Sequence, residues 1–353
     1  MRQAFEQPGP ESARFPGLMW PLTVFALDGA KDIRPLMDAA LDNCRRHGDD
    51  WGVGMLLMFR THMAIDVLGG VQGVDEALAE LRVIGRRAGD RWIRAQVSSA
   101  SAETAMAQGR YDEARAEYEE SLRLAHEVGA YAETPFLMAR LAELAYHAGD
   151  RAGALIALDE AGAAADRHGV ADSRAFIRMM RAQMALDAGE IARARELCDR
   201  TRAEILWGTP PPQFIAAVNG LDALITAAED QPGRALEKLT DTLREAMASR
   251  VPEVIVSALV DGAAQVLVRL GDHRRAARLL GAATADRDRA TRPIPRCQDA
   301  ERCEETAIAE LGRSRYEAER ATGAGFTFDD ILRELDGALA ERMPARATDA
   351  TAE

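Results

Sequence analysis

Residues 89–130 read GDRWIRAQVSSASAETAMAQGRYDEARAEYEESLRLAHEVGA, with glycines near the start, middle and end of the stretch, at Gly89, Gly109 and Gly129. After Gly109, apolar or small side chains follow the three-and-four spacing of one helix face, at Tyr111, Ala114, Tyr118, Leu122 and Ala125. Glycine readily takes the left-handed conformation that ends many helices, so each glycine marks a turn. The stretch therefore predicts two helices joined as a hairpin.

The hairpin signal recurs along the chain with a period of 40 residues. One glycine series falls at Gly29, Gly69, Gly109, Gly149 and Gly189, and a second at Gly48, Gly89, Gly129, Gly169 and Gly208. A small residue recurs five positions after a turn glycine, at Ala114, Ala154, Ala194 and Ala276. This is the tetratricopeptide (TPR) pattern, in which a small side chain lets two helices approach. Because one hairpin cannot bury its apolar face alone, we predict an all-α, right-handed α-α superhelix of about seven stacked hairpins.

Prolines and the last amphipathic patterns indicate how the array ends. Pro293 and Pro295 follow the last hairpin, and 300–321 has the pattern of one long helix. The first helix of the array is expected near 15–28. The predicted organisation is a disordered N-terminus over 1–13, a TPR-like array over 14–286, a linker over 287–299, C-terminal capping helices over 300–342 and a disordered tail over 343–353.

The composition argues against several classes of protein. Aromatic residues make up only 5% of the chain, too few for a typical β-sandwich or barrel core. The 57 acidic residues exceed the 44 basic ones, and the net charge of −13 opposes the approach of nucleic-acid phosphates. No apolar run reaches the roughly 18 residues of a membrane span, and the acidic N-terminus does not resemble a secretory signal. A cytoplasmic protein without direct nucleic-acid or membrane binding is expected.

No local motif predicts a cofactor, a metal ion or a catalytic residue. Lys31 and Lys238 are the only lysines, and neither is followed by the Ser or Thr of a phosphate-binding loop. Cys297 and Cys303 have no histidine nearby, so the four scattered cysteines are interpreted as reduced thiols. Catalysis nevertheless stays open, because groove residues on a helical repeat come from different helices and leave no local motif.

Two C-terminal stretches carry a resemblance to a known family. They are LGDHRRAARLLGAATADRDR at 270–289 and SRYEAERATGAG at 314–325. Together with the 40-residue period, they make the segment from about 16 to 325 resemble the C-terminal TPR region of SARP/AfsR-type (LuxR/MalT-like) actinobacterial regulators. The DNA-binding and ATPase domains of such regulators are missing here. The resemblance implies a sensor module linked to transcriptional regulation and antibiotic biosynthesis, either excised or standing alone.

Repeat symmetry predicts which side chains line a groove. In TPR arrays the first helices of the hairpins face the concave surface, so positions 40 apart should stack there. Mixed aromatic, methionine and charged character suits a peptide or a small ligand. The predicted groove residues are Phe59, His62, Met63, Gln96, Ser99, Glu103, Phe136, Arg140, Glu143, Tyr146, His147, Phe176, Met179 and Gln183.

Simpler interpretations of the same residues stay open. Phe59, Phe136 and Phe176 suit a core between helices equally well, and Glu103 and Glu143 suit a solvated face. If the two glutamates do line the groove, they should attract a cationic group of the ligand. Trp51 and Trp92, both at helix starts, are interpreted as packing anchors between hairpins.

Three functions are compatible with the sequence. The first is a TPR-type ligand- or protein-interaction module of a SARP-like regulator, acting through the concave groove. The second is a stand-alone TPR-fold enzyme or accessory protein of specialised metabolism that binds a small apolar substrate. The third is an oligomerisation scaffold, and the sequence also leaves a homodimer open.

Overall fold

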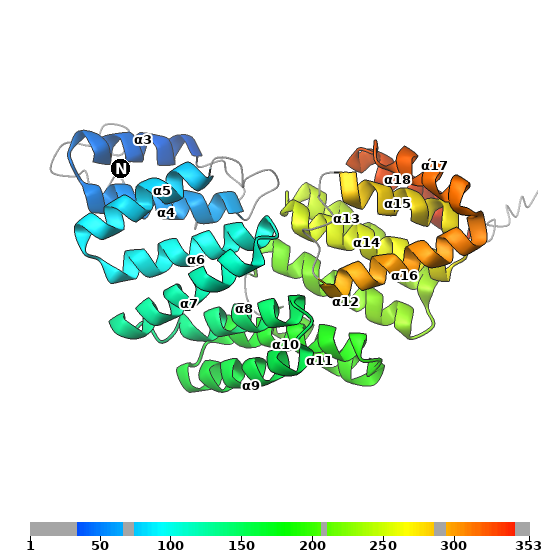
Figure 1. Cartoon of the computed structure of the whole chain (residues 1–353), viewed down its shortest axis with the longest axis horizontal. Coiled ribbons are helices and arrows are strands. Elements are labelled where there is room, and N and C mark those ends of the chain that lie inside the picture. Colours follow the sequence, from blue (N-terminus) through cyan, green and yellow to red (C-terminus); the bar gives the residue numbers. More distant parts are fainter. Residues whose placement is uncertain (1–33, 66–73, 206–209, 286–293, 343–353) are drawn as a thin grey trace, which may run out of the picture. The chain divides into compact units, whose positions relative to one another are not determined.

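The computed structural model describes residues 34–65, 74–205, 210–285 and 294–342, and all regular structure within these ranges is helical (Figure 1). The all-α class predicted from the glycine period is therefore confirmed. The helices are α3 (Arg34–Arg46), α4 (Asp50–Ile65), α5 (Val74–Ala88), α6 (Arg91–Ala107), α7 (Tyr111–Val128), α8 (Thr134–His147), α9 (Arg151–His168), α10 (Ala171–Asp187), α11 (Ile191–Ile205), α12 (Pro212–Ala228), α13 (Pro232–Ala248), α14 (Glu253–Arg269), α15 (His273–Ala285), α16 (Ile294–Leu311), α17 (Arg313–Gly323) and α18 (Phe328–Ala340). The predicted disordered ends and the predicted first helix at 15–28 lie outside the described residues.

The turn glycines end helices in the way the sequence predicts. Gly129 follows α7 with a φ of 73°, in the left-handed region. Beyond it, the Ala130 N–H donates back to the Ala125 carbonyl at 2.9 Å, which is the longer hydrogen bond of a Schellman end. The glycines of the series Gly48, Gly89, Gly129 and Gly169 have a positive φ, and each follows the end of one helix and precedes the next helix.

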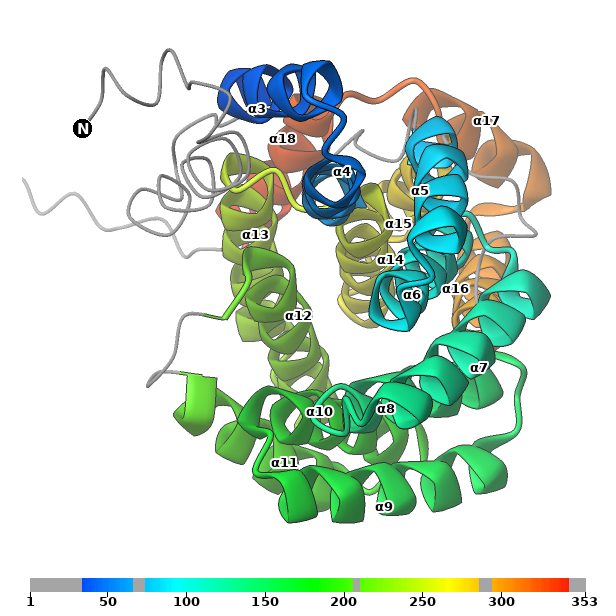
Figure 2. The same ribbon diagram turned by 90° about the vertical axis from the view of Figure 1, so that its left-hand side faces the viewer.

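The first of two compact units comprises residues 1–141 and 163–170. Its helices α3 to α7 pack against one another in chain order (Figure 2). Ala114, five residues after a turn glycine, is completely buried in α7. On the same helix, the Ser121 hydroxyl donates to the Ala95 carbonyl of α6 at 2.9 Å, so the two helices approach closely.

The second unit comprises 142–162 and 171–353, and helices α12 to α18 build an apolar core within it. A buried carboxylate, Asp222 of α12, ties three of its helices together. Asp222 accepts hydrogen bonds from Arg195 of α11 and, at 2.8 Å, from Lys238 of α13. Arg202 of α11 adds a third contact at 3.3 Å. Three cations thus compensate one carboxylate that is only 5% exposed.

The end of the array differs from the prediction at two points. The predicted linker over 287–299 is helical from Ile294, where α16 begins. Pro295 lies in the first turn of that helix, where a missing N–H costs no hydrogen bond. The predicted continuous helix over 300–321 is interrupted at Gly312, whose φ of 77° separates α16 from α17.

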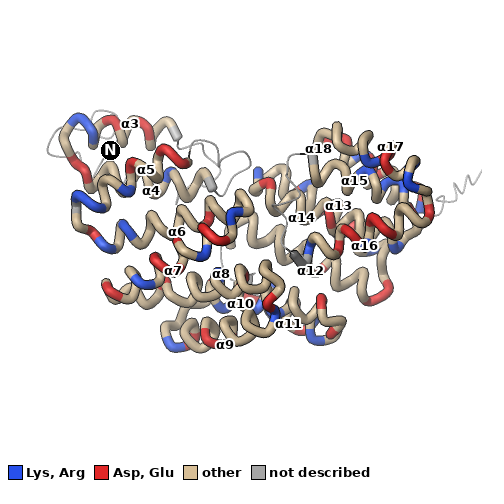
Figure 3. The backbone as a smooth tube through the Cα atoms, viewed as in Figure 1, with Lys and Arg blue, Asp and Glu red and all other residues tan. Residues whose placement is uncertain are grey.

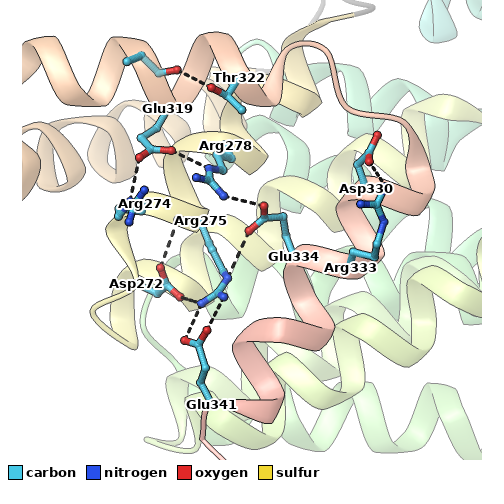
Figure 4. Close-up of polar contacts among 11 residues, drawn as sticks. Asp272, Arg274, Arg275, Arg278, Glu319, Thr322, Asp330, Arg333, Glu334 and Glu341 are labelled. Carbon is cyan, nitrogen blue, oxygen red and sulfur yellow. Dashed lines mark hydrogen bonds and ion pairs between the residues drawn. The ribbon is translucent and has the colours of Figure 1, made fainter.

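Helices α15 and α17 cross at two glycines. A Cβ atom on Gly281 would lie 2.1 Å from the Arg320 carbonyl oxygen, and one on Gly323 would lie 1.8 Å from that of Arg278. Around this crossing, arginines of α15 pair with carboxylates of α17 and α18 (Figure 4). Arg278 alone bridges Glu319 at 2.6 Å and Glu334 at 2.7 Å. The last two helices are therefore fixed to the array by backbone contact and by ion pairs.

Acidic and basic residues are interspersed over the helices of both units (Figure 3). None of the described helices combines the length and the apolar character that a membrane crossing requires.

Candidate ligand-binding face

The structure places the predicted groove residues on the first helices of successive hairpins. In the first unit these are Phe59, His62 and Met63 on α4, Gln96, Ser99 and Glu103 on α6, and Phe136 and Arg140 on α8. In the second unit they are Glu143, Tyr146 and His147 on α8, and Phe176, Met179 and Gln183 on α10.

A hydrogen-bonded triad joins three helices of the first unit. The Arg140 guanidinium of α8 donates through Nε to Glu103 Oε1 of α6 and to Tyr118 Oη of α7, at 2.9 Å each. Its Nη2 also donates to Glu103 Oε2, and the Tyr118 hydroxyl donates to Glu103. The Arg140 and Glu103 side chains are only 14% and 21% exposed, so solvent screens the pair weakly.

Tyr118 keeps its proton in this triad. Burial raises the pKa of the Tyr118 hydroxyl well above its ordinary value; Arg140 lowers it and Glu103 raises it by smaller amounts. Tyr118 has the spacing of the apolar stripe of α7, so the sequence did not predict its polar role. Glu103 was expected to attract a cationic group of the ligand. In the triad, however, Arg140 already balances the charge of the Glu103 carboxylate.

Phe136 lies beside the triad, one turn before Arg140 on α8. Its side chain is 38% exposed, which is unusual for a phenylalanine. The Arg140 guanidinium lies 6.0 Å from the centre of the Phe136 ring and 5.7 Å from that of Tyr118, within the range of cation–π contacts. Of the two interpretations that the sequence left open, the solvent-facing one fits Phe136 better than the core one.

Glu133 is a second polar centre that the sequence analysis missed. It precedes α8 and accepts hydrogen bonds from two residues of α6, Trp92 through Nε1 at 3.0 Å and Gln96 through Nε2 at 2.5 Å. Both donors are neutral side chains, so neither brings a positive charge to the Glu133 carboxylate. Trp92 is thus a polar as well as an apolar anchor between α6 and α8.

The remaining predicted residues of the first unit are half-buried. Phe59 and Met63 pack against its apolar core, and Ser99 is partly covered. His62 places Nδ1 2.9 Å from the Met58 carbonyl, one turn earlier on α4. These side chains extend the surface beside α6 with apolar contact area.

In the second unit the predicted residues are more enclosed. Tyr146 and His147 are only 8% and 7% exposed, so the structure does not leave them open for the ligand contact that the sequence predicted. His147 Nε2 lies 3.6 Å from Glu143 Oε1. Phe176 is half-buried and Met179 packs against an apolar cluster, while Gln183 donates to Asp187 at 2.9 Å. The open, chemically varied surface is therefore the one on α6 and α8 of the first unit.

Within the described ranges, no group of three or more His, Cys, Asp or Glu side chains has the arrangement of a metal site. Cys303 of α16 is buried, and burial, with the nearby Asp299 and Asp261, raises the pKa of its thiol to about 11. Because only a thiolate is a strong nucleophile or metal ligand, Cys303 is chemically quiet near neutral pH.

Comparison with known proteins gives a fold relationship. No protein-family model matches the chain, and neither does any curated protein. Among solved structures, the chain is similar to NprR in complex with its cognate peptide NprX, with 12% sequence identity and a TM-score of 0.57. The match covers 93% of this chain and 94% of that one. This similarity shows a TPR-like helical repeat fold, as the 40-residue period predicts.

Proposed function

We propose that this chain is a peptide- or protein-interaction module that binds through Gln96, Glu103, Glu133, Phe136 and Arg140, here called the α6–α8 face. The observation that carries the proposal is the exposed Phe136 ring, which lies along the chain between Glu133 and Arg140 and 6.0 Å from the Arg140 guanidinium that pairs with Glu103. An apolar anchor surrounded by a few fixed polar groups is the usual composition of a recognition site.

The chemistry of the α6–α8 face suggests the kind of peptide. Phe136 offers apolar contact to an aliphatic or aromatic side chain. Glu133 accepts hydrogen bonds from the neutral side chains of Trp92 and Gln96, and its carboxylate favours a nearby cation such as a lysine, an arginine or a peptide amino terminus. The fold similarity to NprR, which was solved with its cognate peptide, supports a peptide as the ligand class.

The finer proposal is that the module senses its ligand for a transcriptional regulator of the SARP type. It is supported by the resemblance of residues 270–289 and 314–325 to the closing segment of such regulators. A regulator gene beside the gene for this chain would support that assignment. A neighbourhood without any regulator would argue against it.

The binding proposal is tested by selecting ligands from a random peptide display library on the purified full chain. Selected peptides should carry an apolar residue next to a basic one, and calorimetry gives their affinity. Phe136→Ala and Glu133→Gln should each weaken binding by roughly tenfold, or about 1.4 kcal/mol. Tyr131→Ala is the matched control, because Tyr131 is an exposed aromatic of the same unit but stacks on His168 at a hairpin turn.

Two results would contradict the proposal. One is a set of selected peptides that bind Phe136→Ala and Glu133→Gln as tightly as the original chain. The other is a larger loss of affinity for Tyr131→Ala than for Phe136→Ala, which would move the site to the hairpin turns.

A further inference from the structure

The second unit contains an open cavity whose wall is rich in arginine. It lies where the start of α15 meets the ends of α16 and α18, and its volume is about 550 Å³. The wall carries four arginines and two carboxylates, and Leu311 is the one large apolar side chain among the described residues that line it. A cavity of this size is large enough for a small molecule, and its wall suits a charged one.

The two carboxylates of the wall are both bound by Arg275 (Figure 4). Asp272 accepts from Arg275 Nη1 at 2.8 Å, and Glu341 accepts from Nη1 at 2.9 Å and from Nη2 at 2.6 Å. Arg278 is occupied as well, because it bridges one carboxylate of α17 and one of α18. These contacts hold the wall together and leave Arg275 and Arg278 with few donors for a ligand.

Three other groups of the wall keep donors available. Arg274 donates through Nε to Glu319 at 2.8 Å, and its remaining N–H groups have no partner among the described residues. Arg342 donates to the Leu270 carbonyl at 3.2 Å and forms no ion pair within the described part of the chain. His273 Nδ1 is buried and has no hydrogen-bond partner there either. Buried polar atoms usually have partners, and a ligand oxygen would supply one.

The local charge admits an anion, although the chain as a whole carries a net charge of −13. The four arginines of the wall outnumber its two carboxylates. When Glu319 and Glu334 behind the wall are counted too, the cluster is neutral and does not repel an anion as the rest of the chain does. Guanidinium N–H groups bind phosphate and carboxylate oxygens in preference to neutral acceptors.

We propose that this cavity binds a small phosphate monoester, whose phosphate accepts hydrogen bonds from Arg274 and Arg342. The two arginines reach the cavity from different elements, the start of α15 and the residue pair after α18. A phosphate has three terminal oxygens and can accept from both at once, whereas a single guanidinium fork can take up a whole carboxylate, as Arg275 does with Glu341. The cavity exceeds the size of a phosphate group, and its polar wall favours a hydrophilic body such as a polyol or a sugar.

The test is calorimetric titration of the full chain with glycerol 3-phosphate at low ionic strength, with glycerol as the control ligand. Glycerol 3-phosphate should bind with a dissociation constant of about 1 mM or tighter, and glycerol should not bind. Arg342→Gln should weaken binding about tenfold with an unchanged melting temperature, since its one protein contact is a carbonyl. Glu341→Gln should tighten binding, because it removes a negative charge from the wall and loosens the hold on Arg275.

Arg333→Gln is the matched control. Arg333 is an exposed arginine of α18 that pairs with Asp330 and is not part of the wall, so its loss should leave the affinity unchanged. A chain that binds no glycerol 3-phosphate even roughly tenfold above the expected dissociation constant would overturn the proposal. Equal losses of affinity for Arg333→Gln and Arg342→Gln would also refute it, because the attraction would then come from the surface in general. Acetate that competes as well as inorganic phosphate would refute the preference for a phosphate group.

Discussion

Glu103→Gln should destabilise the first unit, although a glutamate on a helix surface usually contributes little. The change keeps the shape of the side chain and removes its charge, so the Arg140 guanidinium loses its ion pair with the Glu103 carboxylate. Hydrogen bonds to charged groups contribute about 1.5–3 kcal/mol, and exposed ion pairs about 0–1 kcal/mol. With side chains only 14% and 21% exposed, the Arg140–Glu103 pair belongs near the first range, and we expect a loss of about 2 kcal/mol.

A matched control in the same unit is Glu80→Gln. Glu80 pairs with Arg45 at 2.7 Å, but these side chains are 40% and 46% exposed. Their pair should contribute about 0.5 kcal/mol or less. Urea unfolding followed by circular dichroism gives both free energies of unfolding. If Glu103→Gln costs no more than Glu80→Gln, the triad does not stabilise the contact between α6 and α8, and the reasoning fails.

Three further predictions concern single positions. Phe136→Ala should cost about 1–2 kcal/mol in free energy of unfolding, because its ring is partly exposed, whereas the buried neighbour Leu137→Ala should cost about 2–5 kcal/mol in the same urea titration. Burial alone would raise the pKa of Asp222, but hydrogen bonds from its cationic partners outweigh it and hold that pKa below its ordinary value. The stability from Asp222 is therefore present above pH about 4 and lost as the pH falls further, and Asp222→Asn should be less stable at neutral pH and show a smaller acid loss. Gly323→Ala should lower the melting temperature in calorimetry, since its Cβ would collide with the Arg278 carbonyl and overpacking costs about 1–3 kcal/mol.

The repeat could be predicted from the sequence because each turn is a local event. The helix after Gly109 was predicted from the spacing of its apolar residues, and α7 spans Tyr111–Val128. Its two ends are marked by Gly109 and Gly129, which take a left-handed conformation that other residues rarely adopt. The start of α16 was missed because a proline was taken as a break, although Pro295 fits a first helical turn.

The candidate site could be predicted only in part. Glu103 and Phe136 were predicted from the 40-residue columns and Arg140 from its place beside them, but no local pattern shows that Arg140 pairs with a carboxylate 37 positions earlier. Tyr118 has the spacing of a core residue, and its hydroxyl acquires a role only when three helices meet. Pairings of this kind depend on tertiary packing, which propensity and periodicity do not encode.

The glycine crossing of α15 and α17 has a consequence for finding distant relatives of this chain. Gly281 and Gly323 each face a backbone carbonyl so closely that neither position admits a side chain unless the helices separate. Most core positions can change to other apolar residues of similar size, but these two positions can change only if α15 and α17 move apart. A pair of glycines 42 positions apart, with an arginine three residues before the first and a glutamate four residues before the second, is therefore a signature that should outlast overall sequence similarity.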